Sequence, residues 1–231
     1  MKYNNKKLIS NGNCAHYFDN RYHGDDAWLS KTIGRYSVLD VVLDGVSTGN
    51  GGKASSFVKE KLKKYNITEY EEIIRLLQEA NSELYEEGKG WLTTKITVSF
   101  KKENTLHLIN AGDSPAYLIR DGKIIEISTP DRDSKKPNVV TSVVGMEKCI
   151  DYHLNEIELK PYDRLILATD GITDNVYPDE ILKIVSSKTT PKEAIEDLKE
   201  LMKIKRATKK GRHDVFGLFK EDDATARIRY F

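Results

Sequence analysis

The feature that most constrains the fold is a series of strand-like segments spaced too closely for helices to lie between them. TTKITVSF, TLHLIN, AYLIR and KIIEI all fall within residues 93–127. Alternation in the first segment places four residues on one face: Thr94, Ile96, Val98 and Phe100. Asp121-Gly122 joins the last two segments and strongly favours a two-residue hairpin. Because hairpins link antiparallel neighbours, the sequence predicts an α+β fold rather than regularly alternating strands and helices.

Further elements are predicted on both sides of this region. VLDVVLD (38–44) and RLILATD (164–170) resemble buried strands, and the C-terminus alternates, with Ala224, Ala226, Ile228 and Tyr230 on one face. Apolar residues at helical spacing predict helices that start near Lys53, Thr68, Pro178 and Thr190. Thr68 with Glu71, and Thr190 with Glu193, match the capping-box pattern of a helix start.

Composition limits the domain count and the class of partner. The 231 residues contain no internal repeat and only six scattered prolines, so we expect a single domain over residues 1–231. The net charge of +1 argues against nucleic acid or an anionic membrane as the main partner. The first residues lack the apolar stretch of a signal peptide, and no apolar run approaches the ~20 residues of a membrane span. These observations predict a soluble, cytoplasmic protein.

Aspartates stand where the predicted strands end. Asp44-Gly45 and Asp170-Gly171 each follow a buried apolar run, and Asp113 lies between two strands. Two pairs flank further strands: Asp25-Asp26 and Asp222-Asp223. Carboxylates beside a low-dielectric interior need a compensating cation or hydrogen-bond donors. Oxygen ligands without a Cys/His set favour Mg²⁺ or Mn²⁺ over Zn²⁺. The residues alone therefore indicate an acidic divalent-metal site of the kind that performs phosphoryl chemistry.

An ordered set of motifs resembles the metal-dependent protein phosphatases of type 2C over nearly the whole chain. The motifs, in chain order, are RYHGDDAW, VVLDGVSTGNGGKAS, WLTTKITV, INAGDSPAYLIRDGKI, TSVVGM, DRLILATDGITDNV and EDDATARIRYF. Each is weak alone, because Asp-Gly is common, but their order is specific. The resemblance implies a four-layer αββα sandwich, in which two central antiparallel sheets pack face to face and helices flank them.

The same resemblance implies a centre with two Mn²⁺ or Mg²⁺ ions. Asp44 would bridge both metals, the Gly45 carbonyl would bind one, and Asp170 and Asp222 would hold the other. Asp25 and Asp26 would act through metal-bound waters. Asp113 would help to hold a weaker third metal. Arg21 would clamp the phosphate.

The implied activity is hydrolysis of phosphoserine or phosphothreonine in a phosphoprotein, by in-line attack of a water shared by the two metals. Arg21, Asp44, Asp170 and Asp222 are the candidate catalytic residues.

Two features of the sequence bear on other interpretations. Val46 stands where many type 2C phosphatases carry a histidine that protonates the leaving group, which leaves open a non-catalytic, phosphatase-like binding or regulatory module. A haloacid-dehalogenase-type phosphohydrolase needs a second aspartate two residues from the first, but Val42 occupies that position before Asp44. The sequence gives no indication of the oligomeric state.

Overall fold

Two five-stranded antiparallel sheets form the centre of the computed structural model, which describes residues 8–47, 50–132, 140–211 and 217–231. Sheet A has the order β1 (Asn13–Asp19), β10 (Ala224–Tyr230), β9 (Arg164–Ala168), β6 (Ala116–Arg120), β7 (Lys123–Glu126). Sheet B has the order β2 (Asp26–Gly34), β3 (Ser37–Gly45), β4 (Thr94–Lys102), β5 (Thr105–Ala111), β8 (His153–Glu158). Every strand pairing is antiparallel, as the hairpin pattern predicts.

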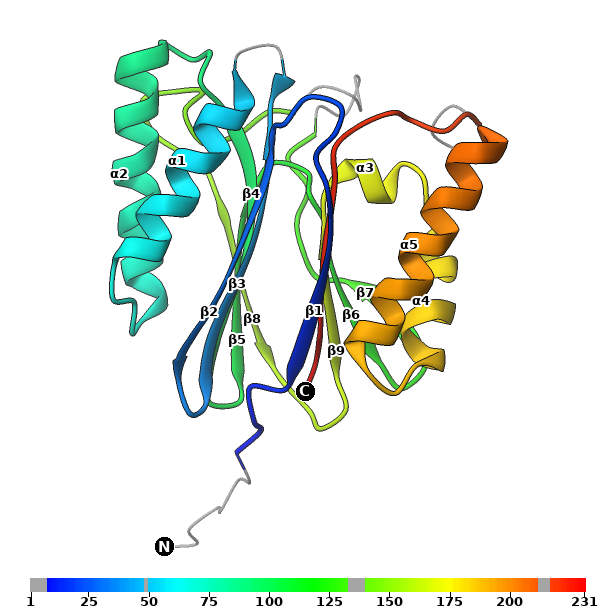
Figure 1. The fold of residues 1–231 in the computed structure, drawn as a ribbon. Coiled ribbons are helices and arrows are strands. Elements are labelled where there is room, and N and C mark those ends of the chain that lie inside the picture. Colours follow the sequence, from blue (N-terminus) through cyan, green and yellow to red (C-terminus); the bar gives the residue numbers. More distant parts are fainter. Residues whose placement is uncertain (1–7, 48–49, 133–139, 212–216) are drawn as a thin grey trace, which may run out of the picture.

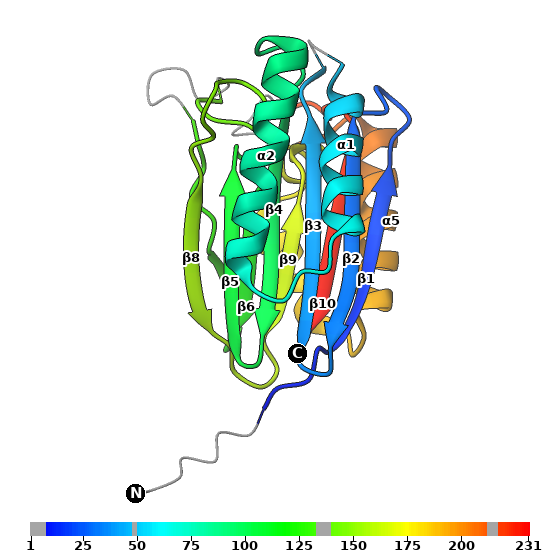
Figure 2. The same cartoon turned by 90° about the vertical axis from the view of Figure 1, so that its left-hand side faces the viewer.

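Helices cover the outer face of each sheet (Figures 1 and 2). α1 (Gly51–Lys64) and α2 (Tyr70–Gly88) pack on sheet B, while α4 (Pro178–Ser187) and α5 (Pro191–Thr208) pack on sheet A. The short α3 (Asp170–Thr173) follows β9 directly. The predicted α+β class and the four-layer αββα sandwich are confirmed. Among the described helices, none combines the length and the hydropathy needed to cross a bilayer.

Three hydrophobic clusters correspond to the three interfaces between layers. Ile96, Val98 and Phe100 of β4 pack with α1 and α2, so the alternation predicted for this strand is confirmed. Ala226 and Ile228 of β10 pack toward α4 and α5, again as predicted. The interface between the sheets holds a smaller cluster of Val42, Leu106, Leu108, Ala116, Leu118, Leu165 and Leu167, with Ile9 and Leu159. The opposite faces of β4 and β10 carry buried polar and charged residues, which therefore lie between the sheets.

The local predictions differ from the structure in a few places. The capping box of α2 uses Glu69 and Glu72, one residue later than the expected Thr68 and Glu71. Asp170 does not end a strand, because β9 stops at Ala168 and Asp170 begins α3. The helix starts at Pro178 and at Thr190-Pro191 are confirmed, the second with its predicted capping box.

Candidate active site

A buried lysine gathers three of the predicted carboxylates at one end of the two sheets. Lys95 lies directly opposite Asp44 in the pairing of β4 with β3. Its Nζ lies 3.0 Å from an Asp44 oxygen, 3.1 Å from an Asp113 oxygen and 3.0 Å from an Asp170 oxygen. Asp113 follows β5 of sheet B, whereas Asp170 follows β9 of sheet A. The strand-end carboxylates thus meet across the two sheets, as the sequence predicts.

A second lysine gathers carboxylates on the side of sheet A. Lys220, in the segment before β10, places its Nζ 3.0 Å from Asp170, 3.0 Å from Asp174 and 3.1 Å from Asp222. Asp174 lies four residues after Asp170, so the turn of α3 brings both carboxylates to one face. Asp170 is shared by the two lysines and connects the two halves of the acidic centre.

Asp26 borders this centre from β2. It lies opposite Asp44 in the strand pairing and is almost fully buried. Its Oδ2 accepts hydrogen bonds from Thr169 Oγ1 at 2.9 Å and from Thr225 Oγ1 at 2.7 Å. Burial is the largest influence and raises the pKa of Asp26 to about 7, although the two hydroxyl donors oppose it.

Charge and burial act in opposite directions on the central residues. Burial and the charge of Asp170 raise the pKa of Asp44 well above its ordinary value, against the effect of Lys95. Burial also raises the pKa of Asp170, but the charges of Lys95 and Lys220 outweigh it and lower that pKa. Burial lowers the pKa of Lys95, but its three carboxylates outweigh burial and raise it well above its ordinary value. Lys95 is therefore an ammonium at neutral pH.

The glycine after each central aspartate permits a close backbone approach. A Cβ on Gly45 would lie 2.4 Å from the backbone carbon of Gly51, where α1 begins. A Cβ on Gly171 would lie 1.9 Å from the carbonyl oxygen of Asp223. Both distances are far inside van der Waals contact, so any side chain would push the segments apart. The predicted metal-binding role of the Gly45 carbonyl stays a prediction.

Three residues near the centre have partners of their own. Asp25 accepts a hydrogen bond from the Gly52 amide at 2.7 Å, at the start of α1. The buried Asp223 accepts from the amides of Tyr22, His23 and Asp25, and thereby holds the 22–25 loop. Arg21 does not reach the central carboxylates: its Nε donates to Asp19 at 2.7 Å, and its side chain is 59% exposed. Its role in binding phosphate stays a prediction.

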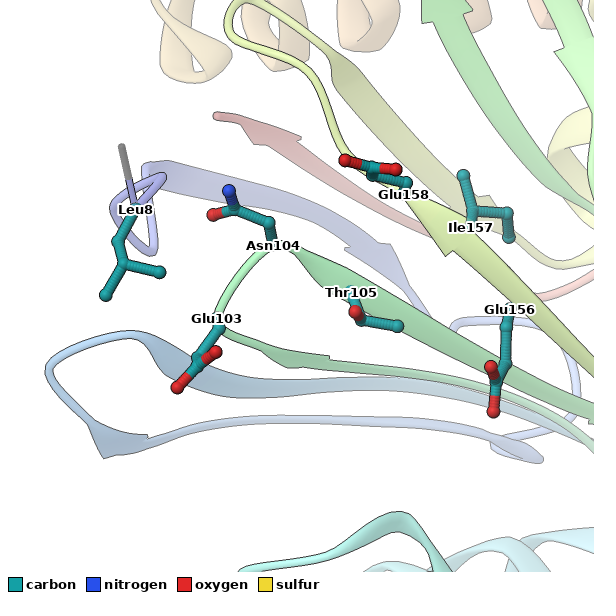
Figure 3. A pocket seen from close by; sticks show the side chains of 7 residues that line it. All are labelled: Leu8, Glu103, Asn104, Thr105, Glu156, Ile157 and Glu158. Atoms are coloured by element: carbon teal, nitrogen blue, oxygen red, sulfur yellow. The ribbon is translucent and has the colours of Figure 1, made fainter. Parts of the chain in front are cut away.

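Sequence reasoning missed Lys95, Lys220 and Asp174. The alternation of β4 contains an indication of the first, because it leaves Lys95 on a face that is buried against the other sheet. In the described part of the chain, no three His, Cys, Asp or Glu side chains are arranged as a ready metal-ligand set. The hollow in Figure 3 lies at the opposite end of the sheets, around the β4–β5 turn and β8, and does not include the acidic centre.

Comparison with known proteins identifies the family. The family model described as Stage II sporulation protein E (SpoIIE) matches residues 48–225. The chain belongs to the SpoIIE family. The SpoIIE-family chain is 35% identical over 101 residues to Probable protein phosphatase 2C 62 of Arabidopsis thaliana, covering 43% of this chain and 14% of that protein. It is 22% identical over 198 residues to a putative protein phosphatase 2C-type of Streptococcus pyogenes, covering 72% and 80% of the two chains.

Solved structures share the fold of this SpoIIE-family chain. The serine/threonine phosphatase Stp1 of Staphylococcus aureus superposes with a TM-score of 0.80 at 22% identity, over 100% of this chain and 99% of that one. PppA, described as a key regulatory component of T6SS in Pseudomonas aeruginosa, gives 0.79 at 21% identity, over 97% and 100%. The predicted resemblance to type 2C phosphatases is confirmed. This chain spans only 14% of the plant relative and 16% of Protein phosphatase 1E from mouse.

Proposed function

We propose that the protein is a divalent-cation-dependent phosphatase that hydrolyses phosphoserine or phosphothreonine in polypeptides, with Mn²⁺ or Mg²⁺ as the cation. The observation that carries this proposal is the convergence of Asp44, Asp113 and Asp170 on one point from the ends of two sheets. Buried carboxylates that meet at one point need a cation, and this cluster of oxygen ligands can accept a divalent ion as well as an ammonium. The family relationship supports phosphate-ester chemistry at this centre.

The donor chemistry of the centre fits a hard divalent cation. The side chains that converge on the two lysines offer carboxylate oxygens, which are the ligands that Mg²⁺ and Mn²⁺ prefer. Asp113 Oδ1 is buried and lacks a hydrogen-bond donor, although it lies 3.1 Å from Lys95 Nζ, so it has capacity for a further cationic contact. The predicted pair of ions has to share this space with two ammonium groups. A bound divalent cation supplies a Lewis acid for phosphate oxygens and lowers the pKa of a coordinated water.

The protein's own residues divide the remaining work. Asp170 and Asp222 would hold a divalent cation, with Asp44 beside them, and Asp26 orders Thr169 and Thr225 behind them. Arg21 binds the phosphate after it turns away from Asp19. That movement leaves no uncompensated charge, because Asp19 keeps a second ion pair of 3.0 Å with Arg206.

A groove beside the centre offers a place for the polypeptide part of the substrate. Its lining runs from Gly24 and Asp26 along the edge of β2 to Lys59 and Lys63 of α1. Phe18, which is 44% exposed, and Trp28 supply apolar contact area in the same groove. An extended phosphopeptide fits this combination of an unpaired strand edge, aromatic rings and lysines.

A second candidate function is a non-catalytic binding module. The observation that favours it is that Lys95 and Lys220 already satisfy the carboxylates without a metal. Val46 in place of a histidine also removes one source of a proton for the leaving group.

The two candidates are separated by phosphate release from a phosphoserine or phosphothreonine peptide with Mn²⁺, with and without EDTA. We expect release that EDTA abolishes, and we expect Asp170→Asn to reduce it at least about a hundredfold, because a charged group at the reacting centre is lost. The matched control is Asp121→Asn, in an exposed hairpin turn whose left-handed backbone tolerates asparagine. Both variants are checked for thermal unfolding. Equal release by wild type and folded Asp170→Asn refutes the phosphatase assignment.

A further inference from the structure

Lys95 is held at the acidic centre by its place on the central strand of sheet B. It lies on β4, which is paired on one side with β3 and on the other with β5. Its side chain is 10% exposed. The chain packs closely behind it: a Cβ at Gly112 would lie 2.7 Å from Lys95 Cβ. Moving the ammonium away from its carboxylates would break three buried ion-pair contacts at once.

Lys220 makes an equal number of carboxylate contacts from a very different position. It lies in the segment between α5 and β10, outside the strands, and its side chain is 34% exposed. A lysine in such a place can turn into water and keep its charge solvated. Asp174 and Asp222 then lose their ammonium partner, and Asp170 keeps only its contact of 3.0 Å with Lys95.

We propose that Lys95 is a permanent internal cation that takes the place of one divalent ion between Asp44, Asp113 and Asp170, so that the centre binds a single ion on the Lys220 side. Asp170, Asp174 and Asp222 hold that ion after Lys220 turns away. The catalytic consequence rests on the proposed function, whereas the number of bound ions does not.

The contacts of the two lysines leave one position for an ion beside Lys95. The two lysines contact five carboxylates in all, since each contacts three and Asp170 is shared. Lys95 offsets one of these charges, and Arg132, 2.9 Å from Asp113, offsets another. Three negative charges are left when Lys220 turns away. The position between Asp44, Asp113 and Asp170 is already filled by the Lys95 ammonium, so a divalent ion has room only on the Lys220 side.

The experiment counts Mn²⁺ ions in the full chain by calorimetry and by electron paramagnetic resonance. We expect wild type to bind one ion per chain with the spectrum of an isolated Mn²⁺. Lys95→Met keeps the length of the side chain and removes its charge, and we expect it to bind two ions with a spin-coupled spectrum. Lys95→Arg keeps the charge and is expected to bind one. The control is Lys102→Met, which lies on the same strand at the surface, where Lys102 pairs with Glu69.

The outcomes separate this inference from the proposed function. Two spin-coupled ions in wild type overturn it, even if Lys95→Met fails to fold, because the wild-type count alone decides. One ion in a folded Lys95→Met variant also overturns it. Wild type that binds one ion and releases no phosphate supports the role of Lys95 while the phosphatase assignment fails. Wild type that releases phosphate with two bound ions supports the phosphatase assignment and overturns the role of Lys95. Wild type that binds no ion overturns both the role of Lys95 and the phosphatase assignment.

Discussion

A buried ionic cluster stabilises the interface between the two sheets. Replacing its single carboxylate measures what the cluster contributes to the free energy of unfolding. Asp40 of β3 accepts hydrogen bonds from Arg229 Nε at 2.5 Å, Arg229 Nη2 at 3.1 Å and Arg227 Nη2 at 2.9 Å. It also accepts from Ser30 Oγ at 2.7 Å. Both arginines belong to β10 of sheet A, so this carboxylate connects the sheets at a distance from the acidic centre. The side chains of all three charged residues are at most 6% exposed.

The change to make is Asp40→Asn, which keeps the shape and removes the charge. Two guanidinium groups then stay buried without a carboxylate. Breaking a buried ion pair by removing one partner costs about 3–5 kcal/mol. The total free energy of unfolding of a domain is about 5–15 kcal/mol, so the variant loses a large part of it. For a chain of this length the midpoint of thermal unfolding falls by about 6–20 °C.

The same cluster gives the pH dependence of this loss. Burial raises the pKa of Asp40, but the hydrogen bonds and charge of Arg229, and then the charge of Arg227, outweigh it and hold the pKa below its ordinary value. A lowered carboxylate pKa means that the folded chain binds fewer protons than the unfolded chain. The stabilisation is therefore present above the unfolded value of 3.8 and is lost as the pH falls through the lower folded value.

Urea denaturation followed by circular dichroism measures the effect at pH 7, with Asp121→Asn as the surface control. A double-mutant cycle with Arg227→Met gives the coupling, which we expect to exceed about 1 kcal/mol for residues in direct contact. A loss below about 1 kcal/mol for Asp40→Asn, at an unchanged slope with urea, would mean that water or rearranged side chains compensate the arginines, and the reasoning from burial would be wrong.

Two further changes test single residues. Burial, with a smaller effect of Arg229, lowers the pKa of Lys101 to about 8, against 10.5 in the unfolded chain. Between these two pH values the unfolded chain binds this proton and the folded chain does not, so the free energy of unfolding should rise with pH. Lys101→Met should remove that rise in urea titrations over this range, and parallel pH profiles of variant and wild type would contradict the shift. Asp223→Ala should cost about 3 kcal/mol by leaving the amides of the 22–25 loop without their acceptor, whereas Asp223→Asn, which keeps one acceptor oxygen, should cost less than half as much. Equal losses in chemical denaturation would show that the carboxylate's charge, rather than its acceptor geometry, holds the loop.

The sequence predicts best the elements whose pattern is set by burial. β4 and β10 alternate cleanly because one face of each packs on helices, and α5 carries its own start signal in Thr190 and Glu193. The sequence pattern does not predict β1 or β8, and each occupies a sheet edge. An edge strand is partly exposed on both faces, as the half-exposed pattern of β8 shows, so its alternation of apolar residues is weak.

The acidic centre was predictable as a set of aspartates but not as a set of contacts. β3 and β5 both pair antiparallel with β4 and so end at the same edge of sheet B, which is why Asp44 and Asp113 lie together; Asp170, after β9 of sheet A, meets them there at Lys95. What surrounds them depends on segments that are distant along the chain. Lys220 reaches Asp170 across 50 positions, and Arg21 turns to Asp19 instead of the centre. No local pattern encodes either orientation.

The strand pattern predicts that two lysines of β4 are buried, but it does not predict their partners. Alternation places Lys95 and Lys101 on the face that meets the other sheet, together with Thr97 and Ser99, so the pattern alone requires acceptors for two ammonium groups inside the protein. The fold meets this need in two ways. Lys101 donates to the backbone carbonyls of Ile9 and Tyr36, which are neutral, and its pKa falls. Lys95 faces carboxylates, and its pKa rises. Since the strand pattern is the same for both, only the charge of the partners from other strands makes one lysine a core residue and the other a cation within the acidic centre.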